Sequence, residues 1–430
     1  MNATTAPEMI DVQALQIGMV VHLDGGWMAH PFALSRFKIT SANQIATIRS
    51  LGLKKVRWEP QNSEAPGSDD DGAISPGDAQ TATGIDPAPA APTRQDQARI
   101  THRKRLARQR DALQLCERQF TEAASACDEL TGLVRARPLD AAGQAQALSR
   151  ALVDKMLGEQ EMCIQLLGAS AGNKASAHAL NVTIMSLLLG RKLGLGEVEM
   201  LDLGVGAMLH DIGKIELQER VRQREDTFIA AEVKEYEDHV AQGVAHARKM
   251  GLAMGALLVV AQHHEQSDGG GFPSRLSGDK MTLPARIVAL VNRYDRLCNP
   301  NLAAQALTPH EAMALLFAAN NARFDPAVLG TFIKMMGVYP PGSLVQLVDG
   351  SHAMVVSVNS TRPLKPRVLV HDAKVPRDDA LVMDLQTQPK LAIVRSLKPR
   401  QLPAPALNYL APAKRVVYFF EPDHELDEQP

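Results

Sequence analysis

The sequence predicts a multidomain protein, in which an all-α helical domain is flanked by a small β-rich N-terminal module and a small C-terminal β-domain. Three observations lead to this prediction. The length of 430 residues exceeds what one hydrophobic core usually organises. A stretch rich in Pro, Gly, Ala and Ser separates the first part of the chain from the rest. Helical periodicity then continues to about Met336, after which short apolar runs alternate with turn residues.

The N-terminal module is expected over residues 1–60. Its apolar MVVHL stretch leads into the turn signal DGG. A helix is expected next, because Ser41 and Gln44 have the spacing of a capping box and Gly52 marks a helix end. The KKVRW segment then returns to strand character. This pattern predicts a β-rich module with one short helix.

A linker and a helical lead-in are expected to follow the module. Residues 61–100 have almost nothing to bury, so they are expected to form a disordered linker. Good helix formers dominate residues 101–171, which predicts one or two long helices. A basic run opens this segment and consists of Arg103, Lys104, Arg105, Arg108 and Arg110. Such a run could contact an acidic partner or nucleic acid, but a solvated helix face is the more common explanation.

The central helical domain is expected over residues 172–336. Its first helix places His178 on the apolar, inward face, because Val182 and further apolar residues follow at helical spacing. Residues 337–420 contain runs such as SLVQLVDG and AMVVSVN, which predict the C-terminal β-domain. The last residues, 421–430, are expected to form a loose tail.

Composition limits the classes of partner. The formal net charge is only -2, so the chain lacks the basic excess that bulk nucleic-acid binding requires. Its 4 cysteines form no CxxC pair, which indicates a reducing compartment. The N-terminal residues lack the basic start and apolar core of a signal peptide, and the apolar runs are too short to span a bilayer. We therefore expect a cytoplasmic protein without membrane insertion.

Histidines cluster in the predicted helical domain. The sequence has two His-Asp doublets, of which His371-Asp372 lies in the β-rich part and is expected to be an ordinary strand end. The other doublet, His210-Asp211, lies in a helical run among further imidazoles and carboxylates. These comprise His178, His239, His263, His264, Asn292 and Asp295, whereas His246 is expected to be a hydrogen-bonded core residue. Imidazole and carboxylate groups from several helices form the mixed donor set that Mn²⁺, Fe or Zn²⁺ favours.

The order of these motifs resembles that of HD-GYP domains. His178 is followed by HDIGK, then by His239, then by HHEQSDGGGFP and LPARIVALVNRYDRL. The front module is similar to the domain of unknown function that precedes many HD-GYP domains, since LQIGMVVHLDGGWMAHPF is followed by KITSANQIATIRSLGLKKVRW. The resemblance implies an HD-superfamily helical fold and a metal-dependent phosphodiesterase that hydrolyses cyclic di-GMP. Diguanylate-cyclase domain proteins and a second copy of the chain are possible partners.

The resemblance also implies a site for two divalent metal ions, with Mn or Fe favoured. His178, His210 and Asp211 would bind one ion, Asp211 would bridge, and the ligands of the other ion would be His239, His263 and His264. Asp211 and Lys214 would be the catalytic residues, with Lys214 donating to a phosphate oxygen.

The glycine-rich loop that follows the histidine pair would contact the substrate. Its residues are Asp268, Gly269, Gly271, Phe272 and Pro273. Glycines permit a sharp turn and a close approach of the backbone to a ligand, and proline stiffens the exit from the loop.

Three departures from the family leave two hypotheses open. Asn292 stands where the family has a metal-binding aspartate, and it would coordinate through its carbonyl oxygen. Phe272 replaces the tyrosine of the GYP triplet, and CNPNLAAQALTP replaces an arginine-rich RPYR segment. The favoured hypothesis is an active phosphodiesterase, because the metal-type histidines are all present. The alternative is a weak or inactive module that regulates by binding nucleotide or protein.

Overall fold

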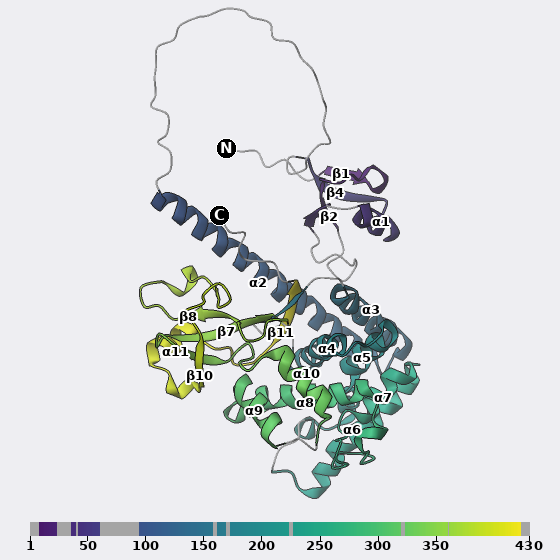
Figure 1. Ribbon diagram of the computed structural model, residues 1–430. Coiled ribbons are helices and arrows are strands. Elements are labelled where there is room, and N and C mark those ends of the chain that lie inside the picture. The colour runs from purple at the N-terminus through teal and green to yellow at the C-terminus, as the bar shows by residue number, and fades with distance from the viewer. Residues whose placement is uncertain are drawn as a thin grey trace, which may run out of the picture. The chain divides into compact units, whose positions relative to one another are not determined.

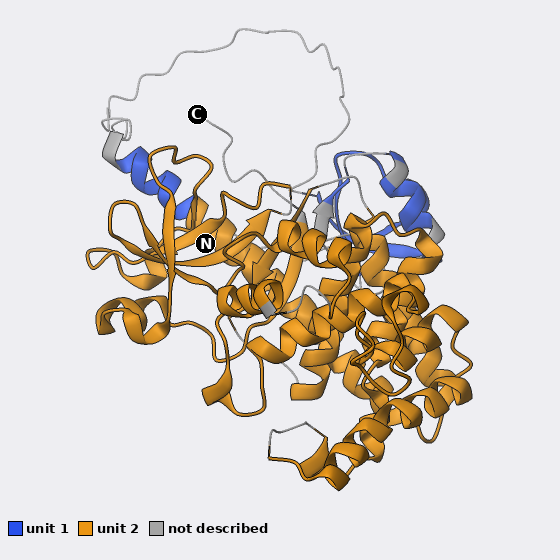
Figure 2. Ribbon diagram, turned by 60° about the horizontal axis from the view of Figure 1, so that its bottom comes forward, with its two compact units in different colours: residues 1–104 blue, residues 105–430 orange. Residues whose placement is uncertain are grey.

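The computed structural model describes residues 8–23, 36–39, 42–60, 94–157, 161–168, 173–222, 227–319, 323–359 and 361–422. The chain divides into two compact units, residues 1–104 and residues 105–430 (Figure 2). Among the described residues, no helix combines the length and the apolarity that crossing a membrane requires.

The N-terminal unit contains a four-stranded antiparallel sheet with the strand order β1-β4-β2-β3. Its strands are β1 (Glu8–Asp11), β2 (Val20–His22), β3 (Arg36–Lys38) and β4 (Lys55–Glu59), and its helix is α1 (Ala42–Ser50). The predicted β-rich module with one short helix is thereby confirmed. Gly52 follows the helix with φ of 72°, a left-handed conformation that glycine adopts without strain. The expected DGG turn and Ser41 lie outside the described residues.

This sheet and its helix share a small hydrophobic core. Strand residues such as Val21 and Val56 turn inward and pack with Ile48 of α1. The same cluster contains Val12, Leu15, Leu23 and Ile39.

The linker predicted over residues 61–100 extends too far at its C-terminal end. Residues 61–93 lie outside the described residues, but α2 (Arg94–Leu133) is already helical from Arg94. The segment RQDQARI contains neither proline nor glycine, so nothing in it opposes helix formation. The five side chains of the basic run in α2 are exposed, as expected for a solvated helix face, and Arg110 also donates to the backbone oxygen of Asp378.

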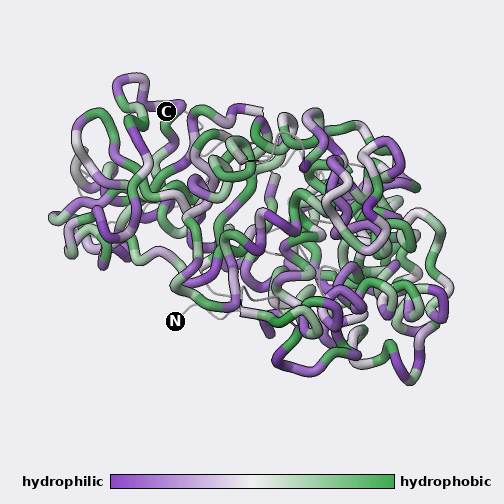
Figure 3. Tube along the Cα trace, turned by 90° about the horizontal axis from the view of Figure 1, so that it is seen from below, coloured by the Kyte–Doolittle hydropathy of each residue, from purple (hydrophilic) through white to green (hydrophobic). Residues whose placement is uncertain are grey.

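The central part of the chain is helical, as predicted. It contains α3 (Pro138–Met156), α4 (Lys174–Lys192), α5 (Glu197–Leu209), α6 (Ala230–Lys249), α7 (Met254–Gln262), α8 (Leu283–Cys298), α9 (Pro309–Ala319) and α10 (Pro326–Met336) (Figure 1). Among the described residues from 177 to 336, the only β-pairing is an isolated bridge between Asp268 and Ser277. Hydrophobic (green) and hydrophilic (purple) stretches of chain alternate over short distances along the tube in Figure 3.

Helix α4 is the most buried of the helices that carry the site. Its residues from Leu180 to Gly190 are buried on every face, so it packs against α5, α8 and α10 as well as against a strand of the C-terminal sheet. A helix that is buried on all sides occupies such an interior position.

The C-terminal sheet is antiparallel and has seven strands. The main path is β10-β6-β7-β5-β11, with β8 paired to β7 and β9 paired to β8. These strands are β5 (Met162–Leu166), β6 (Leu344–Leu347), β7 (His352–Asn359), β8 (Arg367–Val370), β9 (Met383–Asp384), β10 (Ile393–Leu397) and β11 (Tyr418–Pro422), and α11 (Ala404–Leu410) precedes the last strand. His371 directly follows β8, so the second His-Asp doublet is the expected strand end.

Two predictions about this region were wrong. Strand β5 lies in the segment expected to be a helical lead-in, where it pairs with β7 through Cys163 and Asn359 and with β11 through Leu166 and Tyr418. A segment of five residues, four of them buried, is too short to show a period, and only the distant partners make it a strand. The sheet therefore includes a strand from before the helical domain, and residues 105–430 form one compact unit. Glu421 and Pro422, expected in the loose tail, belong to β11.

Candidate metal centre

Three histidines are fixed in the same way at the centre of the helical part. His210 and His263 cap the C-terminal ends of α5 and α7, and His239 lies within α6. The Nδ1 atom of each ring bonds to the backbone carbonyl three residues earlier, at 2.6 Å for His210 and 2.8 Å for His263. A carbonyl only accepts hydrogen bonds, so Nδ1 carries the proton and Nε2 of each neutral ring presents a lone pair.

His178 is fixed by a carboxylate instead. Its Nδ1 lies 2.6 Å from Oδ2 of Asp295, which leaves Nε2 directed toward the other histidines. Asp295 is buried and also accepts hydrogen bonds from Asn181 and from Asn299. Burial acts to raise the pKa of Asp295, but the bond to His178 and the amide donors outweigh it, and the pKa is lowered. An ionised carboxylate behind an imidazole is a common arrangement behind metal-binding histidines.

The four Nε2 atoms meet in two pairs. Those of His178 and His210 lie 3.2 Å apart, and those of His239 and His263 lie 3.3 Å apart. Two acceptor lone pairs at this separation repel each other unless a cation lies between them. The pairs therefore have the chemistry of metal ligands rather than of hydrogen-bonded core histidines.

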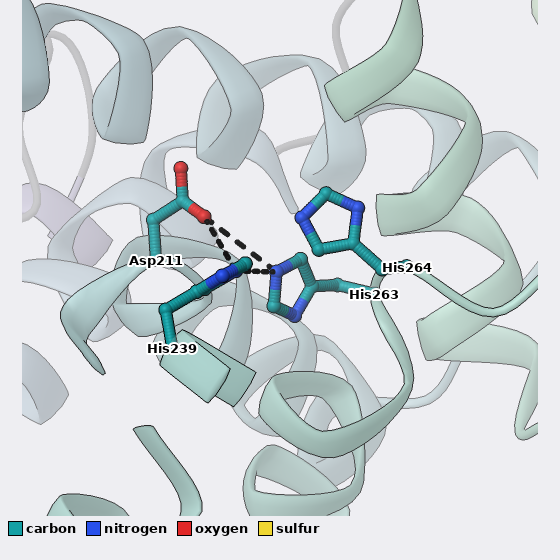
Figure 4. A group of neighbouring side chains, drawn as sticks. All are labelled: Asp211, His239, His263 and His264. Carbon is teal, nitrogen blue, oxygen red and sulfur yellow. Dashed lines mark hydrogen bonds and ion pairs between the residues drawn. The ribbon is translucent and has the colours of Figure 1, made fainter. Parts of the chain in front are cut away.

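Asp211 lies between the two pairs. Its Oδ2 is 3.5 Å from Nε2 of both His178 and His210. Its Oδ1 is 3.4 Å from Nε2 of His239 and 3.6 Å from Nε2 of His263, as the dashed lines in Figure 4 mark. Among the described residues, Oδ1 has no hydrogen-bond donor although it is buried. An orphaned carboxylate oxygen facing imidazole lone pairs fits a divalent cation.

Together these side chains form two groups of possible ligands that share one carboxylate. One group contains His178, His210 and Asp211, and the other contains Asp211, His239, His263 and His264. The structure thus brings together all the histidines for which the sequence predicted a role at the site. His246, expected in the core, is buried and its Nε2 lies 2.9 Å from Glu216.

The carboxylate of Asp211 also contacts two cations. Lys214 Nζ lies 2.5 Å from Oδ2, and Arg296 Nη2 lies 3.2 Å from the same oxygen. Burial acts to raise the pKa of Asp211, but the positive charges of Lys214 and Arg296 contribute to holding it well below its usual range. The carboxylate is therefore ionised at neutral pH.

Gly213 explains how the HDIGK segment comes so close to α6. A Cβ atom at this position would lie 1.9 Å from the backbone oxygen of His239. Only glycine permits the short 3₁₀ turn over Ile212–Glu216, which carries Lys214, to rest on the helix that carries His239.

The glycine-rich loop lies beside His264. The ring of Phe272 stacks on that of His264 with centroids 4.4 Å apart, and Phe272 N donates to the His264 carbonyl. A Cβ on Gly271 would lie 2.5 Å from the same carbonyl oxygen, so the backbone passes very close there. Asp268 is exposed and accepts from the Gly270 amide, which gives it a role in the turn itself. Pro273 is exposed.

Asn292 is buried, and its carbonyl oxygen has a partner. Oδ1 accepts a 3.0 Å hydrogen bond from Nε of Arg296, one turn further along α8. Nη1 of Arg296 donates to the hydroxyl of Tyr236, which lies 3.4 Å from Nε2 of His264.

Sequence reasoning missed both Arg296 and the amides behind Asp295. Arg296 follows Asn292 by four positions, and this spacing on one helix face was the available signal. Asn181 had a similar signal, since it lies three positions after His178 on the same helix.

Known protein families match three stretches of the chain. Residues 161–328 match the HD domain, residues 8–145 match a domain of unknown function (DUF3391), and residues 344–404 match a KOW domain associated with the HD domain. The match to the domain of unknown function continues beyond the β-rich module into α3.

Individual relatives have low sequence identity to this chain. A cyclic di-GMP phosphodiesterase of Pseudomonas aeruginosa is 26% identical over 374 residues, which cover 84% of this chain and 84% of that protein. A cyclic di-GMP phosphodiesterase response regulator of Xanthomonas campestris is 31% identical over 162 residues, 37% of this chain and 43% of the relative. A solved HD-GYP-type protein from Bdellovibrio bacteriovorus aligns with 14% identity and a TM-score of 0.40 over 76% of this chain and 98% of its own. A score this low carries no argument about the fold.

A helical domain with a buried His-Asp doublet, matched by the HD family over the same residues, defines the class as HD-domain proteins. Within that class, the order of His178, HDIGK, His239 and the paired histidines before the glycine-rich loop is the order of motifs in HD-GYP domains.

Proposed function

We propose that the protein is a metal-dependent phosphodiesterase that hydrolyses cyclic di-GMP. The observation that carries this proposal is the pair of ligand groups that share Asp211, in which the Nδ1 atoms of four histidines are held by acceptors so that their Nε2 atoms face the centre. The names of the relatives from Pseudomonas aeruginosa and Xanthomonas campestris support the choice of substrate.

Two divalent ions, Mn or Fe, would be held by these groups. One would be bound by His178, His210 and Asp211, and the other by Asp211, His239, His263 and His264. When bound, the ions supply Lewis-acid activation of water and of the phosphodiester. Asn292 would join the first group only if its carbonyl oxygen turned away from Arg296.

Four of the five histidines are prepared to bind metal at neutral pH, whereas burial acts to lower the pKa of His178 but Asp211 and Asp295 raise it. Burial lowers the pKa of His210 and His239, and it lowers the pKa of His263 to about 3. Burial and the neighbouring His263 hold the pKa of His264 well below its usual range. Neutral imidazoles need not release a proton before they bind a cation, so these residues impose no proton penalty on metal binding near pH 7.

Lys214 lies on the more accessible side of the centre. Its side chain is 15% exposed, whereas those of His210 and His239 are fully buried. A lysine here can donate to a non-bridging phosphate oxygen while it holds Asp211 in place. We place this activity in the cytoplasm, where diguanylate-cyclase domain proteins and a second copy of the chain are the candidate partners.

Turnover of cyclic di-GMP tests the proposal directly. Purified protein is stripped with a chelator, reloaded with Mn²⁺ or with Fe²⁺ under nitrogen, and assayed by chromatography, beside a His210→Ala/Asp211→Ala control. We expect hydrolysis that requires metal and is absent from the control. Metal-loaded protein that leaves cyclic di-GMP intact would refute the proposal.

A nucleotide-binding regulator is the second candidate. It is favoured by one observation, the hydrogen bond between Asn292 and Arg296, which occupies the carbonyl oxygen expected to complete the first group. Calorimetry separates the two candidates, because a regulator would bind cyclic di-GMP without consuming it.

A further inference from the structure

We propose that Arg296 binds a non-bridging oxygen of the substrate phosphodiester, and that the neutral Asn292 keeps its charge available for that contact. This inference rests on the proposed function and adds to it a phosphate-binding residue. The sequence had offered no arginine for this role, because the segment after α8 contains none at the expected place.

The guanidinium is held rigidly at the centre. Nε donates to Asn292 at 3.0 Å, Nη2 donates to Asp211 at 3.2 Å, and Nη1 donates to the hydroxyl of Tyr236. The carbon of the guanidinium also lies 5.7 Å from the centroid of the Tyr236 ring, within cation–π range. These contacts use one N–H of each nitrogen. An arginine has five such donors, so two remain for a ligand.

Arg296 also lies where a ligand can reach it. Its side chain is 24% exposed, more than that of Lys214 or Asp211 at 15% each, while the innermost imidazoles are fully buried. The two cations approach the same oxygen of Asp211 and flank the same ring, since Lys214 Nζ lies 5.4 Å from the centroid of Tyr236.

The charges at this place leave a positive excess. Two cations, Lys214 and Arg296, face the single carboxylate of Asp211. An aspartate at position 292 would neutralise the guanidinium through the 3.0 Å contact that the asparagine makes now. The neutral amide fixes the direction of the guanidinium without cancelling its charge. A phosphodiester anion matches both the excess charge and the paired donors.

The test compares three variants with the parent protein. Arg296→Gln removes the charge, and Arg296→Lys keeps the charge but loses the fork of donors. Arg293→Gln is the matched control, because it removes the same charge from an exposed side chain of the same helix. Melting curves establish that each variant is folded, and metal per chain is measured by plasma mass spectrometry. The affinities of metal-loaded protein for inorganic phosphate and for cyclic di-GMP are measured by calorimetry.

We expect Arg296→Gln to weaken both affinities by roughly 10- to 100-fold, the usual worth of a hydrogen bond to a charged group. Arg296→Lys should lie between this variant and the parent, and Arg293→Gln should match the parent. Metal content should not change. If Arg296→Gln and Arg296→Lys both lose metal, or both keep the parent's affinities, Arg296 only supports Asp211 and the inference is wrong.

The binding measurement stands apart from turnover. A parent that binds cyclic di-GMP through Arg296 but does not hydrolyse it would refute the proposed enzyme and support this inference. If the Arg296→Gln variant hydrolyses cyclic di-GMP as well as the parent does, with unchanged KM and phosphate affinity, the proposed enzyme is supported and this inference is wrong.

Discussion

The backbone amide of Tyr418 donates a 2.9 Å hydrogen bond to Oδ1 of Asn181, which joins the last strand of the sheet to the helix that carries His178. Asn181 in turn donates to Asp295, the carboxylate that orients His178. Asn299 repeats the connection, since it donates to Asp295 and exchanges two 2.8 Å hydrogen bonds with the backbone of Val416. The support of the metal centre therefore includes the C-terminal sheet.

Asn181→Ala should weaken metal binding at the group that contains His178. The change removes a donor to Asp295 and leaves the buried amide of Tyr418 without its acceptor. Loss of such a supporting contact typically costs about 10- to 100-fold in metal affinity. Competition with a fluorescent chelator measures this, and we expect one of two bound ions to be released early. Retention of both ions with a lowered melting temperature alone would show that Asn181 supports the fold but not the centre.

Gly213→Ala should damage both folding and metal binding. The new methyl group would lie 1.9 Å from the backbone oxygen of His239, and backbone cannot move aside as a side chain can. Such overpacking costs about 1–3 kcal/mol or more, and the displaced turn carries Lys214. Urea denaturation and metal content measure the two effects.

Gly143→Ala is the matched control for this change. An added Cβ at Gly143 in α3 meets nothing within 4 Å, and alanine favours a helix interior over glycine by about 0.5–1 kcal/mol. This control should be at least as stable as the parent. Equal stability of the two variants would contradict the tight contact between Gly213 and α6.

Asn292→Asp should increase metal retention and reduce phosphate affinity. One oxygen of the new carboxylate would keep the contact with Arg296, and the other would supply a charged ligand to the first group. We expect slower loss of metal to a chelator, by about 10-fold or more. Asn301→Asp adds the same charge at an exposed position beyond α8 and should behave as the parent. Metal loss at the parent's rate would mean that residue 292 is not a ligand.

The stability of the folded chain should rise with pH between about 8 and 10.5 through Lys155. Burial lowers the pKa of Lys155 from 10.5 to about 8, because the ammonium loses much of its hydration in the folded chain. The cation–π contacts with Phe419 and Phe420, at 4.9 and 5.1 Å from the ring centroids, recover only part of this loss. Between these pH values the unfolded chain binds more protons than the folded chain, so the free energy of unfolding increases with pH. Below pH 8 Lys155 is protonated in both the folded and the unfolded chain, so the buried charge lowers the free energy of unfolding by its full amount.

Lys155→Met should remove that part of the pH dependence. The stability of the parent relative to the variant should rise on the order of 2 kcal/mol across this range, a value reduced from the full shift because the side chain is partly exposed. Urea denaturation at several pH values measures the difference. Lys174→Met at an exposed position should leave the parent's profile unchanged, and parallel profiles for Lys155→Met and the parent would contradict the lowered pKa.

The sequence predicted the parts of this protein that depend on local pattern. The histidines could be predicted as metal ligands for two reasons. His178 follows the helical period, and His210 belongs to a His-Asp doublet that lies among further histidines and carboxylates in the sequence. The fixed Nδ1 atoms use carbonyls only three residues away, so short segments of chain already determine these rings. The all-α character of the central part followed from period and composition in the same way.

Features that depend on distant partners could not be predicted. Strand β5 has only five residues, and its identity comes from β7 and β11, which lie far along the chain. In the sequence Arg296 does not differ from any other arginine on a helix, because its partners Tyr236 and Asp211 lie far along the chain. The role of Tyr418 comes from a hydrogen bond across 237 positions, for which no local pattern exists.

The hydrogen bonds between Asn299 and Val416 can form only late in the synthesis of the chain. A ribosome makes the chain from the N-terminus, so the metal-type side chains and Asn299 emerge well before Val416, which lies 117 positions after Asn299 and just before β11. A nascent chain thus contains all the metal-type histidines before it contains Val416 and Tyr418. The hydrogen bonds by which Val416 and Tyr418 position Asn299 and Asn181 behind Asp295 can therefore form only after residue 418 has been made.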